Sequence, residues 1–197
     1  MRSLTRWTIC VVVTMALGSV FLTNAGVGAV MEDKDVKGTV LKIADAVEKS
    51  DAAGAKKLAE SLKDEDLEDV MHLFKPRKDK GLGIGAKAGA VKPDGIELKV
   101  IALAMNAPPQ KELDEASADL ARSAYVAAAI AEVALIQTEE KAKGKNPKDW
   151  KNWAEGMRQG AIELADAAKA KKPADVKKAA EKMDTNCKSC HKVFRDE

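Results

Sequence analysis

Apolar residues recur every three or four positions along most of this chain, which is the period of an amphipathic α-helix. Residues 33–49 show this stripe clearly and predict a first helix. Residues 51–62 continue the pattern, with Ser50 and Asp51 as caps of a separate short helix, although one long helix through Gly54 fits the pattern equally well. The apolar positions of the first helix are Val36, Val40, Ile43 and Val47.

The middle of the chain is less regular. Residues 64–74 predict another short helix, and residues 77–95 contain five glycines and Pro93, which predicts a long loop. Residues 96–105 are almost entirely apolar, and the turn at 106–109 closes this segment.

The second half predicts three longer helices. Residues 111–141 run without Gly or Pro, Asn146 and Pro147 begin the next helix, and Pro173 begins the last one. The short connections make these helices antiparallel neighbours. The sequence therefore predicts an all-α, antiparallel four-helix bundle with extra short helices and a glycine-rich loop in the N-terminal half. The last helix is expected to bury Val176, Ala179, Ala180, Met183, Cys187, Cys190, His191 and Phe194.

Composition agrees with a helical domain. Hydrophobic residues make up 46% of the 197 positions, mostly Ala, Leu and Val, whereas aromatic residues make up only 4%. A β-sandwich would need more β-branched and aromatic residues.

The N-terminus has the pattern of a secretory signal peptide. Arg2 and Arg6 precede a short apolar run that ends in small residues, with cleavage expected after Ala25 or Ala29. We expect residues 1–29 to be removed and residues 30–197 to form a single domain in the periplasm or another extracytoplasmic compartment. The alternative is an uncleaved anchor, but the run is short for a membrane span, and Cys10 within it lacks the context of a lipid-attachment site.

Charge excludes one class of partner. The whole chain contains 33 basic and 31 acidic residues. Residues 1–29 contain two arginines and no acidic residue, so residues 30–197 contain 31 basic and 31 acidic residues. A formally neutral protein has no general attraction for phosphate, and nucleic acid is therefore not an expected partner.

The chemistry of the chain lies near its C-terminus. Cys187-Lys188-Ser189-Cys190-His191 is the C-x-x-C-H arrangement of c-type haem attachment. Two thiols one helical turn apart can each bond to a vinyl group of the porphyrin, and the following histidine becomes an axial iron ligand. The motif predicts one covalent haem c per chain.

Other uses of this motif fit less well. A zinc site needs a fourth ligand, and the only other histidine is His72. A thioredoxin-like pair needs flanking strands, which the pattern does not predict. A structural disulfide would leave His191 without a role.

The segment from Cys187 to Arg195 resembles the class II c-type cytochromes, the cytochrome c-prime group of four-helix bundles with the attachment motif near the C-terminus. The match includes Phe194 and Arg195, three and four positions after the histidine. The resemblance implies that Arg195 lies beside the proximal histidine and the haem edge. It covers residues 111–197 well and the first half loosely, so residues 64–110 are expected to be an insertion.

The ligand on the other side of the iron decides between functions. The resemblance implies that a methionine on the first helix fills this position in some members, but residues 33–62 contain neither methionine nor histidine. His72 is the leading candidate for a sixth ligand, and Met71 and Met105 are weaker ones. If His72 coordinates iron, the neighbouring basic residues are expected to pair with haem propionates: Lys75, Arg77 and Lys78.

Three functions are compatible with this sequence. The first is a one-electron carrier that exchanges electrons with redox partner proteins. The second is a five-coordinate haem protein that binds nitric oxide or carbon monoxide. A haem enzyme such as a peroxidase is the least favoured, because no acid–base pair accompanies the motif. Some bundles of this kind form homodimers, and this chain is a candidate for one.

Overall fold

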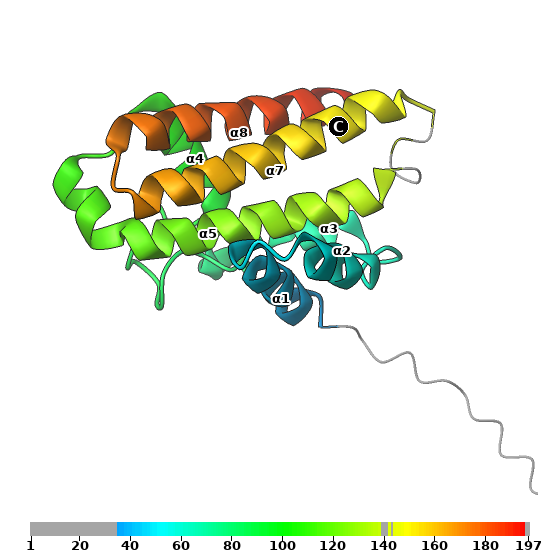
Figure 1. The fold of residues 1–197 in the computed structure, drawn as a ribbon, viewed down its shortest axis with the longest axis horizontal. Helices are drawn as coiled ribbons and strands as arrows, with labels where there is room; N and C mark the ends of the chain where they lie inside the picture. The colour runs from blue at the N-terminus through cyan, green and yellow to red at the C-terminus, as the bar shows by residue number, and fades with distance from the viewer. Residues whose placement is uncertain (1–34, 139–141, 143, 196–197) are drawn as a thin grey trace, which may run out of the picture. The chain divides into compact units, whose positions relative to one another are not determined.

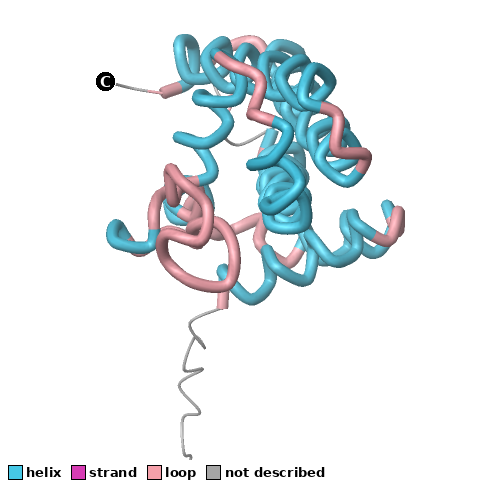
Figure 2. Tube along the Cα trace, turned by 90° about the vertical axis from the view of Figure 1, so that its left-hand side faces the viewer, coloured by secondary structure: helices cyan, strands magenta, loops and turns pink. Residues whose placement is uncertain are grey.

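The computed structural model describes residues 35–138, 142 and 144–195, and within these residues it contains helices and loops but no strand (Figures 1 and 2). The predicted all-α helical bundle is confirmed. The predicted signal peptide, with Cys10 inside it, lies outside the described residues. No helix in the described part of the chain has the length and apolar character that a membrane crossing requires. The elements are α1 (Val36–Glu48), α2 (Ala52–Glu60), α3 (Leu67–His72), the 3₁₀ helix η1 (Arg77–Asp79), α4 (Ile96–Met105), α5 (Gln110–Ile136), α7 (Pro147–Lys169) and α8 (Pro173–Phe194).

The three longest helices, α5, α7 and α8, pack side by side in chain order and alternate in direction (Figure 1). The predicted start of α7 is confirmed, because Asn146 Oδ1 accepts a 3.1 Å hydrogen bond from the Lys148 N–H and Pro147 takes the first helical position. Helices α7 and α8 approach closely at Gly160, where an added Cβ would lie 2.9 Å from the Met183 backbone nitrogen. A glycine at this position therefore sets the spacing of the two helices.

The first two helices are separate elements. Asp35 Oδ1 accepts from the Gly38 N–H at 2.8 Å, and Asp51 Oδ1 accepts from the Gly54 N–H at 2.9 Å. Each aspartate satisfies a backbone donor that a helix start leaves without a partner. Ser50, at φ 58°, turns the chain between the two helices. Both helices pack against α5.

Helix α3 is shorter than the sequence pattern predicts, because Asp66 caps its start through the Glu68 N–H at 3.0 Å. The glycine-rich loop follows it and is tightly closed. The Leu82 N–H donates to the Leu73 carbonyl at 3.0 Å, and the Glu97 N–H donates to the Phe74 carbonyl at 3.3 Å. These two hydrogen bonds therefore bring the two ends of the glycine-rich loop close together.

Helix α4 packs chiefly against α8, whereas α1 packs against α2, α3 and α5. Two faces of α4 are apolar. One face is buried and includes Val100 and Leu103, while the other leaves Leu98 and Met105 exposed. Of the helices in the N-terminal half, α4 is thus the one that accompanies the helix with the C-x-x-C-H motif.

Candidate haem-attachment site

The C-x-x-C-H motif occupies the last two turns of α8. In the first half of this helix, four side chains on one face are buried: Val176, Ala179, Ala180 and Met183. Further along the same face, Cys187 and Cys190 are half-buried against the core, and both are free thiols. Because they are three positions apart on a helix, they lie one turn apart on the same side.

Both thiols are held in their protonated form. Burial is the largest cause, and it raises the pKa of Cys187 to about 12 and that of Cys190 to about 11. The nearby carboxylates of Asp184 and Glu97 raise the Cys187 pKa further. A catalytic dithiol instead needs a lowered pKa, so this environment argues against a thioredoxin-like function.

A compact metal centre is also not formed. No three Cys, His, Asp or Glu side chains are grouped to hold a metal ion in the part of the chain that the structure describes. The two thiols and His191 therefore do not converge as zinc ligands would. Haem attachment needs no such convergence, because the thiols bond to the porphyrin edge and only the histidine reaches the iron.

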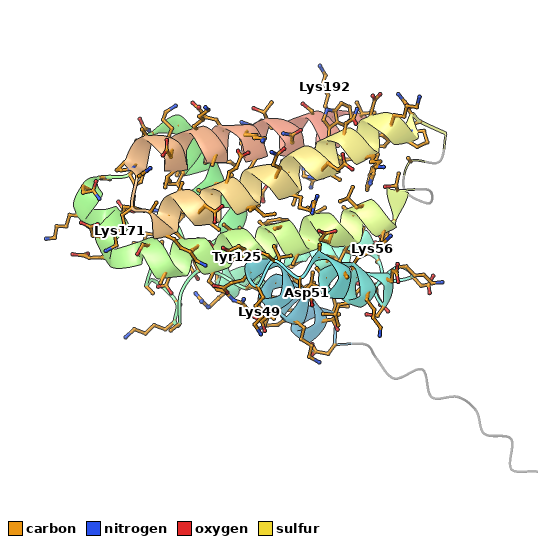
Figure 3. All side chains as sticks on the ribbon, viewed as in Figure 1. Lys49, Asp51, Lys56, Tyr125, Lys171 and Lys192 are labelled. Atoms are coloured by element: carbon orange, nitrogen blue, oxygen red, sulfur yellow. The ribbon has the colours of Figure 1, made fainter. Side chains whose placement is uncertain are left out.

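The expectation that His191 is buried is wrong for this structure, because its side chain is exposed. The face of α8 that is buried in the first half of the helix becomes exposed in its last two turns. Lys192, in the last turn, extends into solvent (Figure 3). The protein atoms on one side of the ring still lower the His191 pKa, and the positive charge of Arg195 lowers it further. Both effects favour the neutral imidazole, which is the form that binds iron.

Arg195 lies one turn after His191. It ends the helix, since the Arg195 N–H donates to the His191 carbonyl at 3.1 Å, and its side chain is exposed. Its positive charge lowers the His191 pKa, and the position beside the haem edge that the family resemblance implies for this arginine stays a prediction.

Glu97 is a site residue that the sequence did not single out. It stands in the first turn of α4, and its negative charge acts on both Cys187 and His191, raising the pKa of each. It is the one acidic residue of α4, whose sequence is apolar apart from Glu97 and Lys99, and this could have identified it. Its relevance depends on the packing of α4 against α8, which the sequence pattern does not contain.

Aromatic side chains fix the end of α8 to the start of α7. The Phe194 ring lies 5.0 Å from the Trp150 ring and 5.9 Å from the Trp153 ring, both in edge-to-face geometry. The indole N–H of Trp150 donates to the Ala134 carbonyl of α5 at 2.8 Å. These contacts hold the turn that follows the motif.

The candidate sixth ligands lie in different places. His72 Nε2 donates a 2.7 Å hydrogen bond to the Asp79 carbonyl, so this nitrogen is already bonded within its own loop. Met71 packs against the core. Met105 is 70% exposed at the end of α4 opposite Glu97. His72 and Met71 lie on α3, whose main neighbours are α1 and α5, whereas Met105 lies on α4, which packs chiefly against α8.

The residues around the motif fit a haem. The two free thiols share one helix face and are partly accessible, and a neutral imidazole follows them directly. Large apolar side chains are exposed on the two helices that pack there, Leu98 at 46% on α4 and Val193 at 39% on α8. A planar apolar macrocycle is the kind of group that such side chains cover.

Comparison with known families agrees with this site. Residues 110–195 match the family model described as Cytochrome C', which covers α5, α7, α8 and the whole motif. The resemblance to class II c-type cytochromes is thereby confirmed over this part of the chain. Comparisons with curated proteins and with solved structures find no match.

Proposed function

We propose that this chain, which is cytochrome c-prime-like over residues 110–195, is a monohaem c-type cytochrome that carries single electrons outside the cytoplasm. The observation that carries the proposal is the arrangement on α8, where two half-buried thiols and a neutral imidazole follow one another on one helix. Proteins of the matched family are haem proteins that transfer electrons or bind gases rather than transform substrates.

Each residue of the motif has a distinct role in this proposal. The S–H of Cys187 and of Cys190 adds across a vinyl C=C, which forms one C–S bond and moves the hydrogen to the other vinyl carbon. This addition consumes no oxidant. His191 is the axial ligand, and Arg195 supplies positive charge beside it. The haem supplies the change between ferric and ferrous iron.

The position of the motif supports electron transfer. Cys190 is partly exposed and His191 is exposed, so a haem held by these residues would lie close to the protein surface. A partner protein can then approach without any opening of the bundle.

Gas binding is the second candidate, and a specific observation favours it. Helix α4, which packs against α8, is mostly apolar and contains no histidine. Its Met105 is 70% exposed at the end of the helix, and His72 is hydrogen-bonded to the Asp79 carbonyl. If no side chain of α4 reached the iron, its sixth position would be open to nitric oxide or carbon monoxide.

Covalent attachment is tested first. The chain is produced in an extracytoplasmic compartment with c-type haem maturation and is treated with acidified organic solvent. Haem should remain with the wild-type protein, and it should become extractable when Cys187 and Cys190 are both replaced by alanine. Complete extraction from the wild type would remove the basis of the proposal.

Carbon monoxide then separates the two functions. An unchanged ferrous spectrum after its addition indicates a six-coordinate carrier, and a rapid change indicates an open site. If carbon monoxide binds to His72→Ala but not to the wild type, His72 is the sixth ligand. Asp69→Ala is the matched control, because it removes an exposed side chain of the same helix and leaves the imidazole in place.

A further inference from the structure

The charges of this chain are unevenly distributed. Residues 75–92, here called the basic loop, contain six basic residues and one acidic residue, Asp79. Residues 30–197 hold 31 basic and 31 acidic residues, which leaves 25 basic and 30 acidic residues outside the loop. A formally neutral chain therefore has a strongly positive segment and a negative remainder. The six basic residues are Lys75, Arg77, Lys78, Lys80, Lys87 and Lys92.

The lysines of the basic loop point to a surface rather than to internal pairing. All five are exposed, and among the described residues none has an ion-pair partner within 4.0 Å. Lys99, just outside the loop, shows the contrast, because it is buried and paired with Glu112 at 2.7 Å. The five exposed lysines thus keep their charge available for a partner.

The basic loop is held in one conformation. Arg77 pairs with Asp94 and donates to the Ile84 and Gly85 carbonyls, while the Ile84 N–H donates to Asp94 at 3.0 Å. Ile84 is buried in the core. At the other end, Lys99 Nζ donates to the Lys92 carbonyl at 2.9 Å. Binding by a preordered loop costs less conformational entropy than binding by a flexible one.

The loop also stands next to the elements of the haem site. Residues 93–95 join it to α4, which packs against α8, and the hydrogen bond between Phe74 and Glu97 brings together the segments on either side of the loop. A partner on the basic loop is therefore placed on the α4 side of the attachment helix.

We infer that the basic loop is the docking surface for an acidic redox partner protein, whose carboxylates pair with the five exposed lysines. The inference rests on the proposed electron-carrier function and adds the surface and the charge of the partner. Opposite charges speed and orient such encounters, and the effect weakens as salt rises.

The test compares two variants with equal charge loss. In the loop variant, the five exposed lysines are changed to glutamine. In the control variant, five exposed lysines within α1 and α2 or directly after α1 are changed in the same way. Lys49 and Lys56 of this set are labelled in Figure 3. The control lysines are Lys37, Lys42, Lys49, Lys56 and Lys57, which also have no ion-pair partner within 4.0 Å among the described residues.

Two probes are used on each haem-loaded protein. Oxidation of the ferrous protein by ferricyanide, a trianion, should slow by about 10-fold at low ionic strength in the loop variant. Its salt dependence should flatten, while the control variant stays close to the wild type. Binding of poly-L-glutamate should likewise be lost only in the loop variant.

Other results overturn the inference. Equal losses in both variants would show an effect of net charge alone. Binding to phosphatidylglycerol vesicles without binding to polyglutamate would assign the loop to a membrane, and salt-sensitive self-association of the wild type that the loop variant loses would assign it to a second copy. Poly-L-glutamate binding does not require haem, so a failure of haem attachment is distinguished from a failure of docking.

Discussion

Phe74 and Glu97 are joined by a backbone hydrogen bond in which the Glu97 N–H donates to the Phe74 carbonyl at 3.3 Å. The bond ties the end of the α3 region to the first turn of α4. It thereby fixes the one acidic residue of α4 where its charge acts on Cys187 and His191. A residue far from the motif in sequence thus becomes part of its electrostatic environment.

Replacing Glu97 with glutamine should raise the midpoint potential of the haem. A negative charge stabilises ferric iron more than ferrous iron, so its removal favours reduction. Coulomb's law at an effective dielectric constant near 20 gives a shift on the order of tens of millivolts. A spectroelectrochemical titration measures it. Glu115→Gln, an equal charge change at an exposed position on α5, should leave the potential unchanged, and equal shifts in both variants would refute a specific role for Glu97.

Replacing Arg77 with alanine should loosen the glycine-rich loop without unfolding the bundle. The guanidinium bonds Asp94 and the carbonyls of Ile84 and Gly85, and its loss leaves these partly buried groups with fewer partners. The local cost is about 1–3 kcal/mol. Hydrogen exchange should speed up at residues 82–94 and stay unchanged in α5 and α7. Uniform loss of protection would mean that the loop is part of the global folding unit.

The thiols of the chain prepared without haem should react slowly with iodoacetamide. Because burial raises the pKa of Cys190 from 9.0 to about 11, the thiolate fraction near pH 8 falls about 100-fold relative to the unfolded chain. The same reaction in concentrated urea is the control. Equal rates in both conditions would contradict the burial of these thiols.

The raised thiol pKa values also make stability depend on pH. The folded chain retains the thiol protons, while the unfolded chain releases them from about pH 9, the unshifted value. Stability should be complete below pH 9 and fall as the pH rises through about 11 and 12. Urea titrations of the haem-free chain measure this, and Cys187→Ala with Cys190→Ala should remove that part of the slope.

Gly160→Ala should destabilise the protein more than Gly156→Ala. A Cβ at 160 would lie 2.9 Å from the Met183 backbone nitrogen, so α7 and α8 must separate, at a cost of about 1–3 kcal/mol. The atoms nearest to a Cβ at 156 belong to the Asn186 side chain, which can shift at the cost of its 2.8 Å hydrogen bond to the Lys182 carbonyl. There the helix-propensity gain of roughly 1 kcal/mol offsets the disturbance. Thermal unfolding compares the two, and equal melting temperatures would disprove tight contact at Gly160.

Local signals were sufficient for the helices of the second half. Asn146 and Pro147 begin α7, Pro173 begins α8, and the short connections make the helices antiparallel, as the pattern predicts. The sequence pattern predicts a helix over residues 64–74, and α3 is shorter than that. Several residues near its start can act as the cap, and the pattern does not show which of them is used. Whether one helix or two span residues 36–60 was likewise decided by the positive φ of Ser50.

The sequence by itself determined the helical bundle and the residues Cys187, Cys190 and His191, because helix period, caps and the C-x-x-C-H spacing are local properties of the chain. Only the tertiary structure decided that α4 accompanies α8, that Glu97 acts on the motif, that His72 bonds to Asp79, and that His191 is exposed. These outcomes depend on which apolar faces pack together. Helix α4 is apolar on both faces, so its sequence alone permits several partners, and the competition among all the helices selects one.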